Sequence, residues 1–171
     1  GGLLRSTDGG EHWEEFPGLY EDVHRLMIHP TDAKFLYAVT GRGLYVGPDA
    51  GARWEQWTRR EDEIGGYPDG FVFRPSDPKT MFMTAAHDAP GTWRTTHFAG
   101  ARISRSWDGG RTWEILRNGL PDRLQASIEA FCLEEAGGSC SLFAATTSGD
   151  VFCSEDLGES WQKIITGLPP I

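Results

Sequence analysis

A group of polar and aromatic residues near the middle of the chain carries side chains that could contact a ligand. A flat aromatic ring offers an apolar face to a sugar or peptide, and charged neighbours can fix its polar groups. The two histidines of the group are ten residues apart. That is not a recognised spacing of metal ligands, so we predict neither a metal site nor a cofactor. The candidate ligand-binding residues are Tyr67, His87, Asp88, Trp93, Arg94 and His97.

Three carboxylates in the same region, Asp62, Asp69 and Asp88, could do acid–base chemistry. Most glycosidases need two carboxyl groups that face one cleft, roughly 5 to 9.5 Å apart. Surface loops are polar by default, so solvated carboxylates explain the same residues equally well. These residues alone leave the choice between catalysis and binding open.

Four short segments indicate how the chain positions these residues. Each has an Asp, a Gly two residues later and a Trp three residues after that, and three of them begin with Ser. An Asp can fold its carboxylate onto nearby backbone N–H groups, and Gly supplies the positive φ of a tight hairpin turn. The segments are marked by Ser6, Asp8, Gly10 and Trp13; by Asp49, Gly51 and Trp54; by Ser106, Asp108, Gly110 and Trp113; and by Ser154, Asp156, Gly158 and Trp161.

The Trp of each segment begins the next strand and is predicted to pack between neighbouring sheets. Burial of one indole ring contributes roughly 4 to 6 kcal/mol at most. We therefore expect Trp13, Trp54, Trp113 and Trp161 to be buried. Trp93 belongs to none of these segments, so we expect it to be exposed or to face a ligand.

A second pattern divides the chain into units of four strands. Ile28 to Asp32 and Phe73 to Asp77 both read as a strand end, a turn at a proline and a new strand. With the Trp segment as the third turn, each unit is a four-stranded antiparallel blade. We predict an all-β fold in which residues 1–171 are part of one β-propeller domain, with about three and a half blades. Its parts are the last two strands of a blade at 1–20 and blades at 21–58, 59–117 and 118–171.

The four segments match the Asp-box, S-x-D-x-G-x-T-W, and the chain resembles the BNR-repeat and sialidase-like β-propellers over essentially its whole length. The resemblance implies a propeller that binds a protein or glycan, as photosystem assembly factors and sorting receptors do, or a sialidase-like or xyloglucanase-like glycoside hydrolase. Phe73 to Ser76 is similar to the sialidase motif F-R-I-P but lacks its Ile, and no arginine triad can be assembled. Arg74 is therefore interpreted as structural. We favour a binding scaffold of uncharacterised function, with the glycosidase as the alternative.

The loops of a blade place the candidate residues on one rim of the propeller. In a four-stranded meander, the first and third turns lie at one end, and the second turn and the link between blades lie at the other. Phe82 and Asp108 are 26 residues apart, whereas Tyr37 and Asp49 are 12 apart. The blade at 59–117 thus carries an insertion in its second turn, which contains His87 to His97. Long loops on a rigid scaffold often hold binding residues.

Composition limits the partners. The formal charge of −9 repels a phosphate backbone, so nucleic acid is not expected. No apolar run approaches the roughly 18 residues that span a membrane, so no membrane is expected either. The three cysteines, an odd number without C-x-x-C spacing, are expected to be reduced and buried, with a Cys132–Cys140 pair as the alternative.

An open arc of blades would leave sheet faces in water, because propellers close with roughly four to eight blades. Residue 1 falls inside a predicted blade. The expected partner is therefore the remaining blades of the same propeller or, as the alternative, a second copy of the chain. A glycan or a protein is the expected ligand, and the residues predict no cellular compartment.

Overall fold

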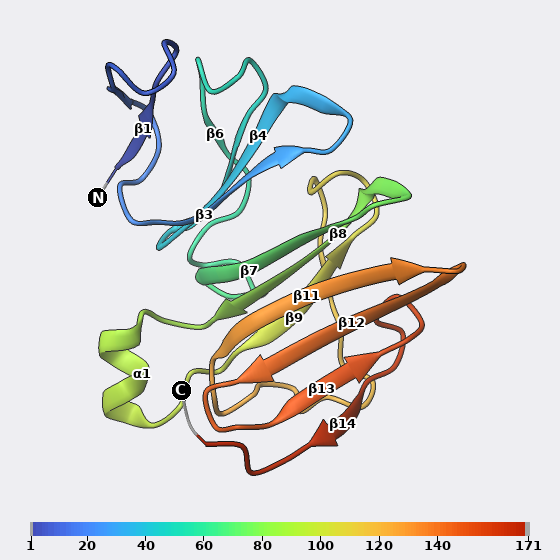
Figure 1. The fold of residues 1–171 in the computed structure, drawn as a ribbon. Helices are drawn as coiled ribbons and strands as arrows, with labels where there is room; N and C mark the ends of the chain where they lie inside the picture. The colour runs from blue at the N-terminus through green and yellow to red at the C-terminus, as the bar shows by residue number, and fades with distance from the viewer. Residues whose placement is uncertain (1, 170–171) are drawn as a thin grey trace.

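The chain folds into four antiparallel sheets that follow one another along the sequence, as a computed structural model describing residues 2–169 shows (Figure 1). The first sheet has two strands and each of the other three has four. Within every sheet, each strand pairs with the strand next to it in sequence, so no connection crosses a sheet. The predicted all-β class and the four-stranded blades are confirmed.

We call the sheets the first to the fourth blade in chain order. The first blade consists of β1 (Leu3–Arg5) and β2 (Glu14–Phe16). The second consists of β3 (Val23–His29), β4 (Asp32–Thr40), β5 (Gly43–Gly47) and β6 (Glu55–Gln56). The third consists of β7 (Tyr67–Arg74), β8 (Asp77–Ala86), β9 (Arg102–Ser106) and β10 (Glu114–Ile115). The fourth consists of β11 (Ile128–Ala136), β12 (Ser139–Thr146), β13 (Val151–Ser154) and β14 (Gln162–Ile165).

The insertion in the third blade forms a short helix, α1 (Pro90–Thr96), where the sequence predicts only a loop. Proline is tolerated in the first turn of a helix because the N–H that it lacks would have no partner there. The hydroxyls of Thr95 and Thr96 donate to the carbonyls one turn earlier, and His97 ends the helix with a φ of 57°. Seven residues are too few to show a helical period. No helix in the described residues is long and apolar enough to cross a membrane.

Two apolar clusters lie between successive blades. Leu44, Phe71 and Met81 belong to the cluster between the second and third blades, and Phe82 and Phe152 to that between the third and fourth. All five are at most 2% exposed. A side chain of this size contributes about 1.5 to 3 kcal/mol when it is fully buried. These clusters fix the blades against each other and so fix their loops.

Three of the Asp and Trp segments form the turn between the third and fourth strands of a four-stranded blade, and the first forms the turn between β1 and β2. Backbone bonds join this turn to the start of the second strand: Ala50 N–H donates to the Lys34 carbonyl (2.7 Å) and Gly109 N–H to the Lys79 carbonyl (2.9 Å). The fourth blade has a bridge at the same place, between Cys140 and Asp156. These turns therefore lie at one end of the blades, and α1 lies at the other end, which we call the α1 rim (Figure 1).

The prediction that all four Trp residues are buried is wrong. Trp161 is 3% exposed, Trp54 and Trp113 are half-buried, and Trp13 is 61% exposed. Trp161 belongs to the apolar cluster between the third and fourth blades, and Trp54 packs edge-on against Phe16 of the first blade. Within this chain no sheet precedes β1, so the ring of Trp13 has no such surface. Trp93, expected to be exposed or to face a ligand, is half-buried.

The cysteines follow the expectation only in part. All three are free, so the alternative Cys132–Cys140 pair does not form. Cys140 is buried, and burial raises the pKa of its thiol. Cys132 is exposed because it lies on the outer face of the fourth blade, opposite Phe143 and away from the third.

Candidate functional site

The carboxylates of the repeated turns are engaged by the turns themselves. In the third blade, Ser106 Oγ donates to Asp108 Oδ1 (2.8 Å), and the N–H of Gly110 donates back to Ser106 Oγ (2.8 Å). Asp108 also accepts from the N–H and the hydroxyl of Thr112. Burial of Asp108 opposes its charge, but the bonds from Thr112, Ser106 and Arg111 outweigh this and lower its pKa to about 2. These groups stabilise the turn.

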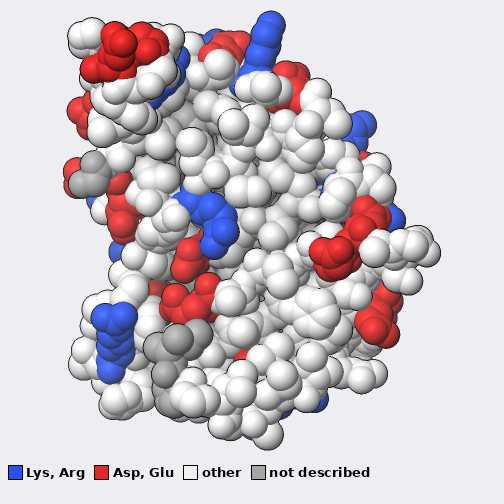
Figure 2. All heavy atoms as spheres, viewed as in Figure 1, with Lys and Arg blue, Asp and Glu red and all other residues white. Residues whose placement is uncertain are grey.

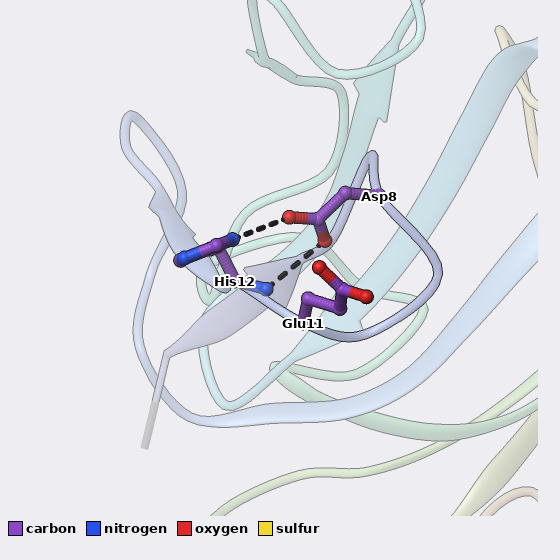
Figure 3. Close-up of side chains that lie close together, drawn as sticks. All are labelled: Asp8, Glu11 and His12. Carbon is purple, nitrogen blue, oxygen red and sulfur yellow. Dashed lines mark hydrogen bonds and ion pairs between the residues drawn. The ribbon is translucent and has the colours of Figure 1, made fainter.

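Asp8, Glu11 and His12 in the first blade lie close enough to suggest a metal site, with possible ligand atoms within 4.8 Å of one another (Figure 3). All three are exposed. Asp8 accepts from the backbone N–H of His12 (3.0 Å) and lies 2.6 Å from His12 Nδ1, so His12 takes the place of Thr112 in the third blade. Its carboxylate is therefore part of the turn, and we assign this cluster no ligand.

A pocket of about 560 Å³, which we call the large pocket, lies on the α1 rim between the third and fourth blades. Trp93, Arg94 and His97 form the wall contributed by α1. The other wall comes from the link between these blades, the turn after β12, and strands β13 and β14. The remaining lining residues are Pro121, Leu124, Gln125, Ala126, Thr146, Thr147, Ser148, Asp150, Phe152 and Lys163.

A smaller pocket of about 200 Å³ lies on the other side of α1, where the innermost strands begin. Its lining includes Tyr67, Asp69, Trp93 and Arg94, which the sequence indicated. It also includes residues that the sequence analysis missed: His24, Pro90, Ser127 and Glu129. Its position in the repeat could have indicated His24. His24 lies four residues before Ile28 in the second blade, and Asp69 lies four residues before the equivalent Phe73 in the third.

His24 and Tyr67 form a hydrogen-bonded wall of the small pocket. His24 Nδ1 lies 2.6 Å from the Pro68 carbonyl, which can only accept, so Nδ1 carries a proton. The two rings lie 4.4 Å apart, and the Tyr67 hydroxyl donates to Asp22 (3.3 Å). Burial and the nearby Asp22 raise the pKa of Tyr67 to about 12. Tyr67 therefore stays a neutral hydrogen-bond donor and is unsuited to act as a nucleophile.

Three sequence candidates line neither of these pockets. Asp62 accepts from the N–H of Arg59 (2.7 Å) and closes a turn in the link between the second and third blades. Asp88 accepts from Arg60 (2.6 Å), and His87 lies 3.9 Å from the same carboxylate. Of the sequence candidates, only Trp93, Arg94 and His97 line the large pocket among the described residues. Tyr67 and Asp69, at the end of the link between the second and third blades, line the small pocket instead.

Buried arginines hold this rim in place. Arg102 is 6% exposed and donates to the Glu63 and Asp122 carbonyls, which belong to the links on either side of the third blade. Arg117 pairs with the carboxylates of the same two residues (both 3.2 Å).

On the face seen in Figure 2, acidic and basic side chains are interspersed and no continuous basic area forms. Arg74 pairs with Glu135 (2.9 Å), a contact between the third and fourth blades that fits its interpretation as structural.

No protein-family model matches the chain. The xyloglucanase Xgh74A of Acetivibrio thermocellus is 30% identical over 198 aligned residues, which cover 99% of this chain and 23% of that protein. An ancestral GH74 enzyme superposes with a TM-score of 0.74 at 17% identity, over 98% of this chain and 22% of its own. YCF48 from Cyanidioschyzon merolae superposes with a TM-score of 0.63 at 18% identity, over 91% of this chain and 44% of its own. The chain is thus homologous to a segment of a xyloglucanase, shares the fold of GH74 propellers, and spans about a quarter of that relative's length.

Proposed function

We propose that this chain is part of a larger β-propeller that binds a polysaccharide on the α1 rim. Trp93 carries the proposal, because this one aromatic side chain lines both the large and the small pocket. Sugar rings stack on such faces while neighbouring polar groups fix their hydroxyls. The xyloglucanase at 30% identity supports a glucan with β-linked glucose in its backbone as the ligand.

Exposed apolar residues support the larger propeller. Ile28 and Leu36 are paired on the face of the second blade that turns toward the first. The two strands of the first blade leave Leu36 8% exposed but Ile28 58% exposed. Two further inner strands in the first blade would cover Ile28. In this arrangement residues 1–20 are the outer half of a blade, blades follow at 21–58, 59–117 and 118–171, and the repeated turns are Asp-boxes.

Hydrolysis of the bound polysaccharide is the second candidate, and the small pocket supports it. Asp69 and Glu129 both line this pocket beside Trp93 and Arg94. A glycosidase of the common type needs one carboxyl group as general acid and another as base or nucleophile. Asp88 stays a third candidate on the same rim, held by Arg60.

Binding of xyloglucan oligosaccharides to the complete protein tests the first proposal. Trp93→Ala should weaken binding about tenfold or more, as the loss of an aromatic anchor does. Trp107→Ala is the control, since it removes an exposed Trp that follows β9 at the opposite end of the blade. Unchanged affinity in Trp93→Ala, or equal losses in both variants, would rule out the α1 rim as the binding surface.

Turnover separates the two candidates. In a hydrolase, Glu129→Gln and Asp69→Asn should each lower kcat by about 10² to 10⁴ while the ligand still binds. Asp88→Asn tests the third carboxylate in the same way. Glu61→Gln, which removes an exposed carboxylate on the same rim, is the control and should keep full turnover. A protein that binds the oligosaccharides but shows no reducing-end release is a binding scaffold.

A further inference from the structure

Arg94 is the one cation of the large pocket whose charge is not compensated by the described residues. Lys163 is already paired with Asp150 (2.7 Å). The guanidinium of Arg94 lies over the Trp93 ring, 5.4 Å from its centroid. Within residues 2–169, Arg94 has no carboxylate within 4.0 Å and no hydrogen-bond acceptor on the protein. A guanidinium has five N–H donors in a planar fork, and here all of them are free to meet a ligand.

The buried arginines of the same molecule show the contrast. Arg105 bonds to Glu114, Glu159 and the Leu157 carbonyl, and Arg102 contacts Glu63 and Asp122. Those arginines hold blades and links together, and their donors are occupied. Arg94 performs no such role in the described residues. It is fixed only through α1, whose C-terminal carbonyl at His97 accepts from Gln125 (3.2 Å).

The other residues of the large pocket add no net negative charge that would repel an anion. Among the described residues the pocket's only carboxylate is that of Asp150, which Lys163 and the Thr166 hydroxyl (2.9 Å) both engage. The pair of Lys163 and Asp150 is neutral as a unit, so Arg94 gives this wall a net positive charge. Arg94 also lines the small pocket, but there Asp69 and Glu129 add two carboxylates to the wall, so an anion is favoured only on the side of the large pocket.

We infer that the large pocket takes a sugar unit bearing a carboxylate, a uronic acid, and that Arg94 binds this carboxylate through paired N–H donors. The inference rests on the proposed polysaccharide binding and specifies its ligand. Arginine and carboxylate match in a planar two-bond geometry that a neutral hydroxyl cannot reproduce. Trp93 lies next to Arg94, so the sugar ring can lie on the indole while its carboxylate reaches the guanidinium. The overall charge of −9 repels anions from the protein as a whole. A preference for acidic sugars would therefore have to come from Arg94 itself.

Matched neutral and acidic ligands test this inference on the complete protein. The probes are xyloglucan oligosaccharides and the same oligosaccharides with their free primary alcohols oxidised to carboxylates. We expect the oxidised set to bind about tenfold tighter in calorimetry at low salt, with a smaller advantage at high salt. Arg94→Gln should abolish this advantage, so that the variant binds the oxidised and the neutral set with equal affinity. Arg94→Lys should keep only part of it, since a point charge cannot form the paired bonds.

Arg59→Gln is the control, because it also removes an exposed charge from the same rim but lies outside the large pocket. Equal affinity for both sets of probes, or the same loss in Arg59→Gln and Arg94→Gln, would overturn the inference and leave polysaccharide binding standing. Binding of neither set would instead remove the proposed function itself. The two failures are thus distinguishable in one experiment.

Discussion

The turns of the first and fourth blades have nearly the same internal bonds but very different surroundings. In both, a Ser hydroxyl donates to the Asp (2.8 Å) and accepts from the Gly N–H, at 2.7 Å from Gly10 and 2.9 Å from Gly158. Yet Trp13 is 61% exposed and Trp161 is 3% exposed. The residues of a turn therefore specify its shape, whereas burial of its Trp depends on the blade in front of it.

The largest effect expected from this comparison is at Trp161. Trp161→Ala removes a ring buried in the apolar cluster between the third and fourth blades, which also contains Phe82 and Leu116. Truncation of a buried aromatic ring typically costs about 3 to 5 kcal/mol, and we expect that loss in the free energy of unfolding measured with denaturant. Trp107→Ala, at a 48% exposed Trp, should cost about 1 kcal/mol or less. Similar losses in the two variants would show that packing on the preceding blade is not what distinguishes Trp161.

A smaller effect is expected from the Ser that opens the turn. Ser106 is 1% exposed, and its hydroxyl accepts from the N–H groups of Gly110 (2.8 Å) and Asp108 (3.3 Å). Ser106→Ala leaves a buried N–H without a partner, which costs about 1 to 3 kcal/mol. Ser6→Ala breaks the same bonds in the exposed turn, where water can replace them, and should cost less than about 1 kcal/mol. An equal loss at the two positions in denaturant unfolding would contradict the role that we give to the neighbouring blade.

Most of the fold could be predicted from the sequence, because its signal is local. The Asp, Gly and Trp of each turn are a few residues apart, and three of the four turns also have the Ser that completes the hydrogen bonds. The exposure of Trp13 could not be predicted in this way. The exposure of this Trp depends on whether another blade packs against the turn, and the spacing of residues within the turn carries no information about that.

One wall of the large pocket was predictable from the sequence, because a single segment carries it. Trp93, Arg94 and His97 were found because they lie in one insertion, and they do line the large pocket. The helix that holds them was not found, because seven residues with Pro90 and Gly91 at the start show no apolar period. The opposite wall, with Gln125, Thr147 and Lys163 among others, comes from the fourth blade. In the sequence these polar residues are indistinguishable from those of an ordinary solvated loop. They lie opposite α1 only because the third and fourth blades pack against each other.

The smallest effect expected is on the pH dependence of the two turns, and it tests whether their shape is independent of burial. Hydrogen bonds from His12 and Ser6 lower the pKa of Asp8 to about 2, and the pKa of Asp108 is also about 2. An unfolded Asp titrates near 3.9, so each turn adds stability that is fully present above about pH 4 and is lost as the pH falls toward 2. We expect the side-chain carboxyl signals of Asp8 and Asp108 to titrate with midpoints near 2 in a carbon NMR titration. A midpoint near 3.9 for Asp8 alone would mean that the exposed turn is open in solution, and that a neighbouring blade is needed to form the turn as well as to bury its Trp.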